Sequence, residues 1–287
     1  MKKLIVFILS LTGVTYTFAQ FDSTALNNVF GKKGTVQGGV YKVTFPRSDL
    51  KVKVNDFSVS PGLALTSWIG FVKMGDHSMM MGDLVLLDSE LPNVISKLMS
   101  ENLEVTAIHN HLAGEQPNIK YIHFSGMGDA TKLAQSIKNV LSITGTPLTQ
   151  SQTQNQNTAN PDWSKVEAIL GTTGKHNGIL LQYAFPRNDK LTEHGMEMPP
   201  AIGMATAINF QMDGNKAGIT GDFVLTADEV NPVIRALTEN GIAPTALHNH
   251  MLYDEPRLFM MHFWAVGDPE ELAKGLKAAL DKTNSKR

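Results

Sequence analysis

The feature that most constrains this chain is an internal repeat. Arg187 of Phe-Pro-Arg stands 140 positions after Arg47 of the same tripeptide, and His248 stands 139 positions after His109 in a shared Thr-Ala-x-His-Asn-His segment. Further matches follow in the same order with almost no slippage, which indicates duplication of a whole folding unit. Duplicated domains often retain the interface of an ancestral homodimer. The sequence therefore predicts two similar domains in pseudo-twofold contact.

The repeat sets the domain organisation. At 287 residues the chain exceeds the usual size of one domain, and two domains fit it better. We expect repeat domains at residues 30–143 and 163–284. Between them, residues 144–162 are rich in Gln, Thr, Asn and Ser and lack apolar periodicity, which is typical of a flexible linker.

Residues 1–20 are typical of a signal peptide. Lys2 and Lys3 precede an apolar run over residues 4–14, and small residues suited to cleavage follow, near Ala19 or Gln20. That run is too short for a spanning helix, and no later segment is apolar for about 18 residues. We therefore expect a periplasmic or secreted protein without a membrane span.

Composition narrows the function classes. Hydrophobic residues make up 42% of the chain and charged residues 18%, which is enough apolar material for packed cores. The absence of cysteine excludes disulfides, Cys-type metal sites and a lipidated cysteine. A net charge of -2 without long basic runs gives no attraction toward phosphate backbones. The expected partner is an unknown small molecule or envelope component, not nucleic acid.

Hydrophobic periodicity predicts an α+β fold in each copy. Six segments of copy one alternate in polarity or are rich in β-branched and aromatic residues, at 40–45, 51–59, 68–74, 78–87, 104–111 and 120–125. A period of 3.6 predicts a helix over 91–101, and Asp268 before Pro269 is typical of the start of the closing helix in copy two. A short helix is expected over 163–170. The order ββββ-α-ββ-α predicts an antiparallel sheet with its helices on one face, including a split βαβ unit.

Six of the nine histidines form two matching triplets. His109 and His111 are two residues apart, so both side chains leave one face of a strand, and His123 has the same parity on the next strand. Apolar Ile108 and Ile122 have the opposite parity. If these apolar residues face the helices, the histidines project together from the other face. His109 directly across from His123 would bring their Cβ atoms to about 4.5–5.5 Å, close enough to share a metal ion.

Three imidazoles with an open fourth position are typical of a catalytic or exchangeable zinc site. We predict one divalent-metal site in each copy, with zinc as the first candidate. The predicted ligands are His109, His111 and His123 in copy one and His248, His250 and His262 in copy two. Glu115 and Glu255, in the loops that follow, are candidates for the general base of a metal-dependent hydrolase.

Other interpretations of the histidines stay open. They could line a ligand cleft or form a structural polar network between the copies of a non-enzymatic envelope module. One could act as an acid or base without metal. The run His109-x-His111-x3-Glu115 also matches a cupin metal motif, but the two helices per copy disfavour that fold. Abundant methionine, as at Met79 to Met81, admits copper as well as simple core packing.

Two arginines are candidates for substrate binding. Arg47 and Arg187 follow Phe-Pro at the end of a strand, where a guanidinium could grip a carboxylate or phosphate. A structural salt bridge, for instance to Asp83 and Asp222, is the alternative. Those aspartates could in turn contribute metal ligands or serve only at a turn or strand edge.

The repeated motifs resemble the LppY/LpqO family of exported bacterial proteins. The resemblance lies in Phe45-Pro46-Arg47 and in residues 81–86, 106–111, 220–224 and 245–263, where Glu255-Pro256-Arg257-Leu258 is especially typical. It covers about residues 30 to 284. The resemblance implies an exported, duplicated domain but no activity, because the family has no established one. Its namesake members are lipoproteins, whereas this chain lacks the anchoring cysteine, so we expect free periplasmic residence.

Overall fold

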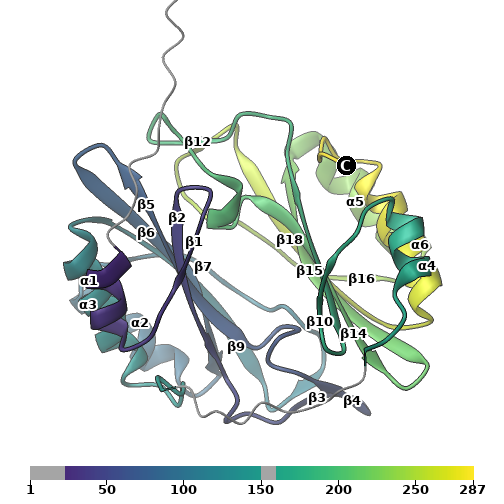
Figure 1. Ribbon diagram of the computed structural model, residues 1–287, viewed down its shortest axis with the longest axis horizontal. Coiled ribbons are helices and arrows are strands. Elements are labelled where there is room, and N and C mark those ends of the chain that lie inside the picture. The colour runs from purple at the N-terminus through teal and green to yellow at the C-terminus, as the bar shows by residue number, and fades with distance from the viewer. Residues whose placement is uncertain (1–22, 150–159) are drawn as a thin grey trace, which may run out of the picture.

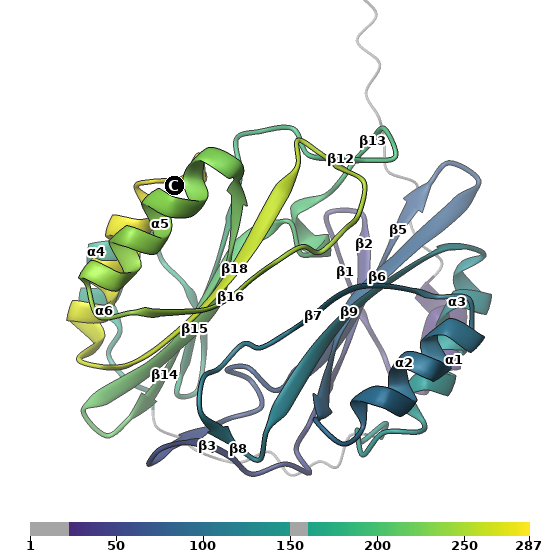
Figure 2. The same ribbon diagram turned by 180° about the vertical axis from the view of Figure 1, so that it is seen from behind.

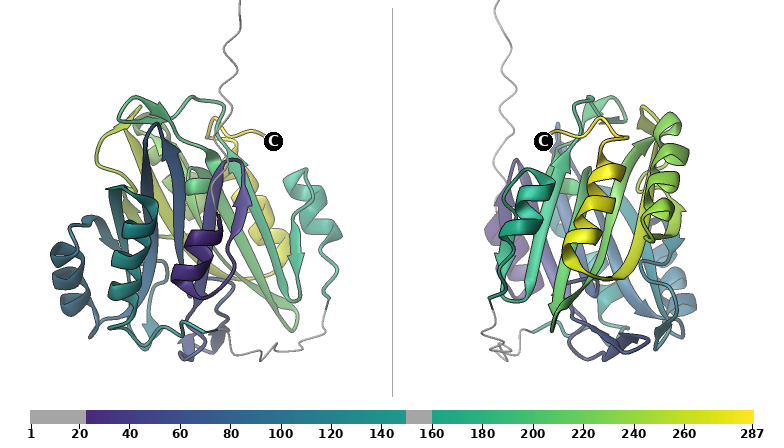
Figure 3. Two further views of the ribbon diagram at one scale, coloured as in Figure 1. Left: turned by 60° about the vertical axis from the view of Figure 1, so that its left-hand side comes forward. Right: turned by 90° about the vertical axis from the view of Figure 1, so that its right-hand side faces the viewer.

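The chain forms four layers. The computed structural model describes residues 23–149 and 160–287, so the predicted signal peptide and most of the predicted linker lie outside the described residues. Two six-stranded antiparallel sheets face each other at the centre (Figure 1), and the view from behind shows helices on the outer side of each (Figure 2). Side views show the helices of each half lying across the back of its own sheet (Figure 3).

Repeat one builds the first sheet, in the strand order β1-β2-β5-β6-β9-β7. Its strands are β1 Thr35–Gln37, β2 Val40–Pro46, β5 Thr66–Met74, β6 His77–Leu87, β9 Ile119–Gly128 and β7 Glu104–His109. A small second sheet consists of β4 Phe57–Val59, β3 Val52–Val54 and β8 Glu115–Gln116. The helices are α1 Ser23–Phe30, α2 Leu91–Ser100 and α3 Ala130–Leu141.

Repeat two has the same topology, with the strand order β10-β11-β14-β15-β18-β16. Its strands are β10 Lys175–Asn177, β11 Leu180–Pro186, β14 Ala205–Asp213, β15 Lys216–Thr226, β18 Leu258–Gly267 and β16 Ala243–His248. The small sheet consists of β13 Met196–Glu197, β12 Thr192–Glu193 and β17 Asp254–Glu255. The helices are α4 Ser164–Leu170, α5 Ala227–Glu239 and α6 Pro269–Leu280, with a short 3-10 helix η1 at Pro200–Ile202.

The predicted α+β class is confirmed. Strand β9 lies between β6 and β7 and is antiparallel to both, so β6, α2 and β7 form the expected split βαβ unit. Helix α6 begins at Pro269, and the Asp268 side chain accepts hydrogen bonds from the first-turn N–H groups. The sequence did not predict α1, whose Leu26 and Phe30 pack into the core of repeat one. None of the helices in residues 23–149 and 160–287 is long and apolar enough to cross a membrane.

Both faces of the central strand β6 are covered. Leu84 and Leu86 point toward the helices and join the core of repeat one. Met81 and Val85 point the other way, into two apolar clusters that combine side chains of both repeats. Along this strand Asp83 lies between Met81 and Val85, so a polar position separates the two apolar clusters in the layer between the sheets.

Each repeat also sends a segment across to the other. In the hairpin of β3 and β4, Phe57 packs edge-on against Trp264 of repeat two, with ring centroids 5.7 Å apart. Just after this hairpin, the Ser60 backbone N–H donates to Gln211 of repeat two at 2.8 Å. In return, η1 lies over β2 and β5 of repeat one, where Gly203 packs beside Trp68. These contacts hold the two sheets face to face.

In each repeat a buried arginine follows the second strand and anchors it to neighbouring elements. Arg47 is fully buried, and its guanidinium donates to Asp49, to Glu90 and to the carbonyl oxygen of Val85. The Glu90 carboxylate also accepts from the backbone N–H groups of Leu87 and Gly145. A single ion pair therefore links strand β2, strand β6, the start of α2 and the segment after α3.

Repeat two contains the same anchor. Arg187 donates to Asp189, Glu229 and the Val224 carbonyl oxygen. Glu229 also accepts from the backbone N–H of Asn284. The salt-bridge interpretation of the two arginines is thus confirmed, but their partners are not Asp83 and Asp222.

We expect Arg47→Met to lower the free energy of unfolding by about 2–4 kcal/mol, because it removes a fully buried guanidinium and leaves the partly buried Glu90 carboxylate without its charged partner. Denaturant unfolding followed by circular dichroism measures the loss. Lys97→Met is the control, since its pair with Glu101 is a partly exposed i,i+4 bridge worth about 1 kcal/mol at most. Equal losses for the two variants would show that the buried anchor carries no special stability.

Candidate functional site

The six triplet histidines meet between the two sheets. In each repeat the first histidine ends an edge strand, the second lies two residues further in the following loop, and the third lies on the neighbouring strand. These are His109, His111 and His123 in repeat one, and His248, His250 and His262 in repeat two. Four of the six are buried, and His111 and His248 are partly buried. We call these six residues the histidine cluster.

Rings from the two repeats alternate within the histidine cluster. His109 stacks on its equivalent His248, with ring centroids 4.0 Å apart and planes 9° apart. Beside this pair, His111 lies 3.7 Å from His262, and the equivalent contact of His250 with His123 is 4.1 Å. Each contact has a counterpart with the repeats exchanged, as a pseudo-twofold axis through the cluster requires.

This arrangement differs from the expected separate histidine site in each repeat, because the two triplets lie together between the sheets. The sheets pack with their histidine-bearing faces together, so every ring has neighbours from the other repeat. The predicted pairing was wrong, since Tyr121 lies opposite His109 and Ala107 lies opposite His123. The predicted parity holds for Ile122, which is buried toward the helices, but Ile108 is 50% exposed because β7 is an edge strand.

Backbone carbonyl groups orient the third histidine of each repeat. His123 Nδ1 lies 3.1 Å from the Gly82 carbonyl oxygen, and His262 Nδ1 lies 2.6 Å from that of Gly221. A carbonyl can only accept, so Nδ1 carries the proton and Nε2 keeps its lone pair. Glycine is required at position 82, because a Cβ there would collide with the Trp68 carbonyl oxygen. A metal-binding histidine needs this tautomer when Nε2 is the ligand atom.

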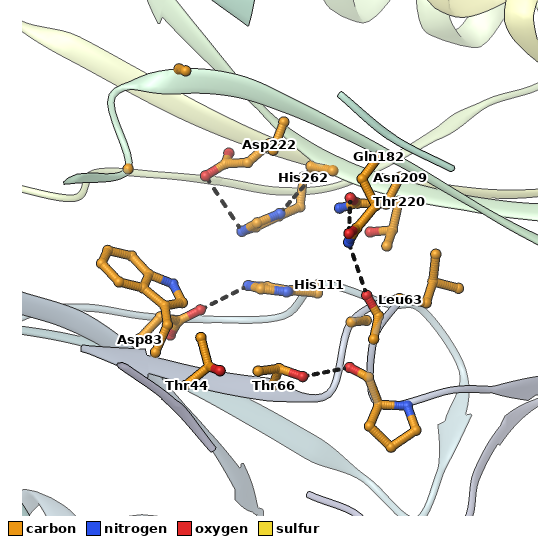
Figure 4. Close-up of a pocket in the computed structure, with 18 of the residues that line it drawn as sticks. Thr44, Leu63, Thr66, Asp83, His111, Gln182, Asn209, Thr220, Asp222 and His262 are labelled. Carbon is orange, nitrogen blue, oxygen red and sulfur yellow. Dashed lines mark hydrogen bonds and ion pairs between the residues drawn. The ribbon is translucent and has the colours of Figure 1, made fainter. Parts of the chain in front are cut away.

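Two aspartates complete the site. Asp83 lies directly opposite His123 in the β6–β9 register, and its Oδ2 is 3.1 Å from His111 Nε2. Asp222 occupies the equivalent place, with Oδ2 2.8 Å from His250 Nε2 and 3.9 Å from His262 Nε2. Figure 4 shows each carboxylate pointing into the space between the sheets. The aspartates therefore serve neither a turn nor a strand edge, because both lie in mid-strand beside the histidines.

Many polar atoms in this site are buried without a hydrogen-bond partner. The unpartnered atoms are His109 Nδ1, both ring nitrogens of His248, Nε2 of His123 and His262, and Oδ1 of Asp83 and Asp222. A buried polar atom without a partner costs about 1–3 kcal/mol, and native proteins contain few of them. Such a concentration at one point indicates that the donors have a partner of another kind.

Three sets of side chains bring their ligand atoms within 4.8 Å of one another. The first ligand group is His109, His111 and His262, the second is His109, His123 and His248, and the third is Asp222, His248 and His250. The first and second groups each combine residues of both repeats. Imidazole nitrogen and carboxylate oxygen are the donors that zinc and other first-row transition metals take in proteins.

Burial keeps His111 and His262 neutral at neutral pH. It lowers the pKa of His111 to about 3 and that of His262 to about 4, and the other histidines nearby add to the effect. Burial also raises the pKa of Asp83 to about 7, although the neighbouring His262 and His250 oppose this shift. The same burial acts on Asp222, but the electrostatic interactions with His262 and His250 and the hydrogen bond to His250 outweigh it and hold the pKa of that carboxyl below its usual range.

A cavity of about 300 Å³ lies on one side of the site (Figure 4). Asp83, Asp222 and four histidines of the cluster line it, whereas His109 and His248 do not. The other walls come from strands β2 and β5, from the loop before β5 and from strands β11, β14 and β15. Small molecules that fill this cavity would therefore contact the histidines and aspartates directly.

Comparison with known proteins places the chain in a family. Residues 24–143 and 164–282 each match the family described as Domain of Unknown Function (DUF1259). The chain is a member of the DUF1259 family. The two matches confirm that the internal repeat is a duplicated domain, and they leave its activity open. No curated protein matches the sequence.

Three solved structures are weakly similar to this DUF1259 protein. The trimeric bacterial microcompartment shell protein PduB is 12% identical over 87% of this chain and 89% of that chain, with a TM-score of 0.22. EtuB from Clostridium kluyveri is 11% identical over 87% and 88%, with a TM-score of 0.21. TP0453 is 10% identical over 91% and 98%, with a TM-score of 0.19. At these TM-scores the likeness carries no argument.

The remaining predicted site residues of the DUF1259 protein lie outside the three ligand groups. Glu115 is buried on β8, where its carboxylate accepts from the Ile119 backbone N–H at 3.3 Å. Glu255 is exposed on β17, where its backbone pairs with that of Thr192. Arg47 and Arg187 are occupied by the carboxylates of their own repeats. The general-base and substrate-binding roles of these four residues stay predictions.

Three residues beside the site were missed by the sequence analysis. Tyr121 stacks on His111 at 3.5 Å and donates to the Ala64 carbonyl oxygen, Trp68 lies edge-on to His123 at 6.4 Å, and Lys42 lines the cavity. The parity of Tyr121 matches that of His123, which places it on the same face of β9. No sequence signal of comparable strength marked Trp68 or Lys42.

We expect the metal-free DUF1259 protein to lose stability as the pH falls from 7.5 to 5. Histidines whose pKa is lowered by folding, such as His111 and His262, bind fewer protons in the folded chain than in the unfolded chain. The free energy of unfolding therefore falls as the pH drops below about 6.5. Asp83 has the opposite effect: because folding raises its pKa, it increases the free energy of unfolding as the pH falls from about 7 to 4. Asp83 is a single group, however, and the effect of the several histidines is larger.

Calorimetry of chelator-treated protein measures the effect, and we expect the Tm to drop by roughly 5 °C or more over this range. The double variant His111→Gln and His262→Gln should show a flatter pH dependence. A Tm that stays constant or rises toward pH 5 in the unmodified chain would contradict the assignment of neutral, buried histidines.

Proposed function

We propose that this protein binds transition-metal ions at a single centre shared by the two repeats. The observation that carries the proposal is the coincidence of buried, unpartnered imidazole and carboxylate atoms with three groups of ligand atoms, each within 4.8 Å of one another, two of which combine both repeats. Coordination would satisfy atoms that otherwise stand buried without partners. The Nδ1 hydrogen bonds of His123 and His262 support it, because they present Nε2 as the ligand atom.

The centre has room for two ions. The first and third ligand groups share no residue, so each can hold an ion at the same time. The pseudo-twofold relation supports the same number, because it maps His109 and His111 of the first group onto His248 and His250 of the third. Zinc is the first candidate, since six imidazoles and two carboxylates are typical zinc donors. Copper is less favoured, because Met79, Met81 and Met260 pack in an apolar cluster.

The cavity beside the centre supports reaction chemistry in addition to storage of the ions. Four histidines and both aspartates reach its surface, so a small molecule there would meet the metal-binding side of the site. A metal ion at such a site lowers the pKa of bound water and polarises a bound oxygen. Asp83 has an unpartnered Oδ1 and can accept a proton beside the cavity. Metal-dependent hydrolysis is the reaction class that this arrangement favours.

Export is part of the same proposal. The basic start and the apolar run over residues 4–14 support a periplasmic or secreted protein of the LppY/LpqO type. Such proteins meet metal ions outside the cytoplasm.

We expect about two metal ions per chain when protein purified without a histidine tag is reconstituted with zinc and measured by elemental analysis. His262→Ala should release the ion of the first ligand group, because two ligands remain. Adding Asp222→Ala should release the second ion. Both substitutions lie in repeat two, so a separate site in repeat one would still retain one ion. A chain that loses both ions therefore distinguishes the shared centre from separate sites.

His77→Ala is the control, because His77 is exposed on β6 outside the three ligand groups, and it should keep both ions. Bound metal should also raise the Tm of the unmodified chain by mass action. Absence of metal after reconstitution with zinc, copper, nickel and manganese would overturn the proposal and favour a structural polar network.

A further inference from the structure

The cavity beside the histidine cluster is asymmetric, although the repeats that enclose it are equivalent. Lys42 on β2 lines it from repeat one, and the equivalent position on β11 is Gln182. Trp68 on β5 corresponds to Ala207 on β14. The sheet needs none of these side chains for its pairing, so the differences shape the cavity and not the fold.

Lys42 is a cation held without an opposing carboxylate. Its Nζ lies 4.1 Å from the centroid of the Trp68 ring, and no ion pair or side-chain hydrogen bond of Lys42 occurs among residues 23–149 and 160–287. Burial lowers the pKa of Lys42 to about 8. A cation–π contact compensates only part of the lost hydration, which leaves Lys42 suited to an anionic ligand.

Lys42 is also close to the proposed metal centre. The Trp68 ring that it covers lies edge-on to His123, with centroids 6.4 Å apart. One indole ring therefore separates the ammonium group from the histidine cluster. Lys42 and the metal-binding side chains both line the cavity, so an anionic group in the cavity can meet both.

The rest of the cavity combines apolar surface with a few polar groups. Pro61, Leu63, Ala205 and Ala207 contribute apolar surface. Thr220 is 2% exposed, lines the cavity and has an Oγ1 without a partner. Figure 4 shows Thr220 beside Gln182 and Asn209 at the end of the cavity near Leu63. Such a mixture suits a ligand with a polar end and an apolar body.

We propose that the cavity binds a small organic oxyanion, with its charged group in reach of Lys42 and the metal centre and its apolar body against Leu63 and Ala205. This inference rests on the proposed function. Without metal, Asp83 and Asp222 line the same cavity and would repel an anion. With two divalent ions bound, their charge exceeds that of the aspartates, and Lys42 adds to the excess. Metal must therefore bind first, and the oxyanion second.

Titration calorimetry with the zinc-loaded full chain tests this order. Benzoate and phenyl phosphate are the probes, and they distinguish a carboxylate from a phosphate group. We expect at least one to bind about tenfold or more tightly than neutral benzamide, and about tenfold or more tightly than to metal-free protein. Acetate, which lacks the apolar body, should bind more weakly than benzoate. Benzamide or acetate binding as tightly as benzoate would overturn the inference.

Lys42→Gln installs in repeat one the residue that repeat two carries at the equivalent position. We expect it to keep both zinc ions and to weaken binding of the preferred probe about tenfold or more. Lys42→Arg should retain most of the affinity, because it keeps the charge. Lys53→Gln is the matched control, since Lys53 is an exposed lysine of the same repeat, and it should bind like the unmodified chain.

The possible failures are distinguishable. A chain that binds no metal overturns the proposed function and this inference together. A chain that binds two zinc ions but neither benzoate nor phenyl phosphate overturns the inference alone. Unchanged affinity in Lys42→Gln, with zinc content intact, overturns the role of Lys42 as the anion-binding group.

Discussion

The contact between the two sheets is the constraint on which the rest of this structure depends. Each sheet has one face covered by its own helices and one face that must be buried elsewhere, and the second repeat covers it. Two apolar clusters occupy most of that layer and contribute the hydrophobic stabilisation expected between packed sheets. Between them lie six imidazoles and two carboxylates, which burial would disfavour without strong partners. The apolar clusters thus hold together a polar site that could not assemble by itself.

Duplication explains how this site is built. Contacts that build the histidine cluster occur twice with the repeats exchanged, as in the pairs of His111 with His262 and of His250 with His123. The surroundings depart from this symmetry. Tyr121, which stacks on His111, corresponds to Met260, and Lys42 corresponds to Gln182. The symmetric residues form the proposed metal centre, and the asymmetric residues form a cavity with one cationic wall.

The site gives chemical content to a family that is defined only as a domain of unknown function. Its donors, their tautomers and their burial all agree with metal coordination, and each of these properties is independent of the family match. The buried arginine anchors have a different task. Arg47 and Arg187 tie strands, helices and the end of each repeat together, away from the cavity, so their recurrence in both repeats reflects stability.

Sequence alone determined the duplication, the α+β class, the split βαβ unit and the grouping of the histidines on one face of each sheet. These features are local, because alternation along a strand and the 3.6-residue period of a helix depend only on near neighbours in the chain. Tertiary structure decided which histidines meet. The bulge between Val105 and Ala107 placed Tyr121 opposite His109, and the docking of the sheets mixed the two triplets. Asp83, Trp68 and Lys42 reach the site through strand pairing and sheet packing, which no local pattern in the chain encodes.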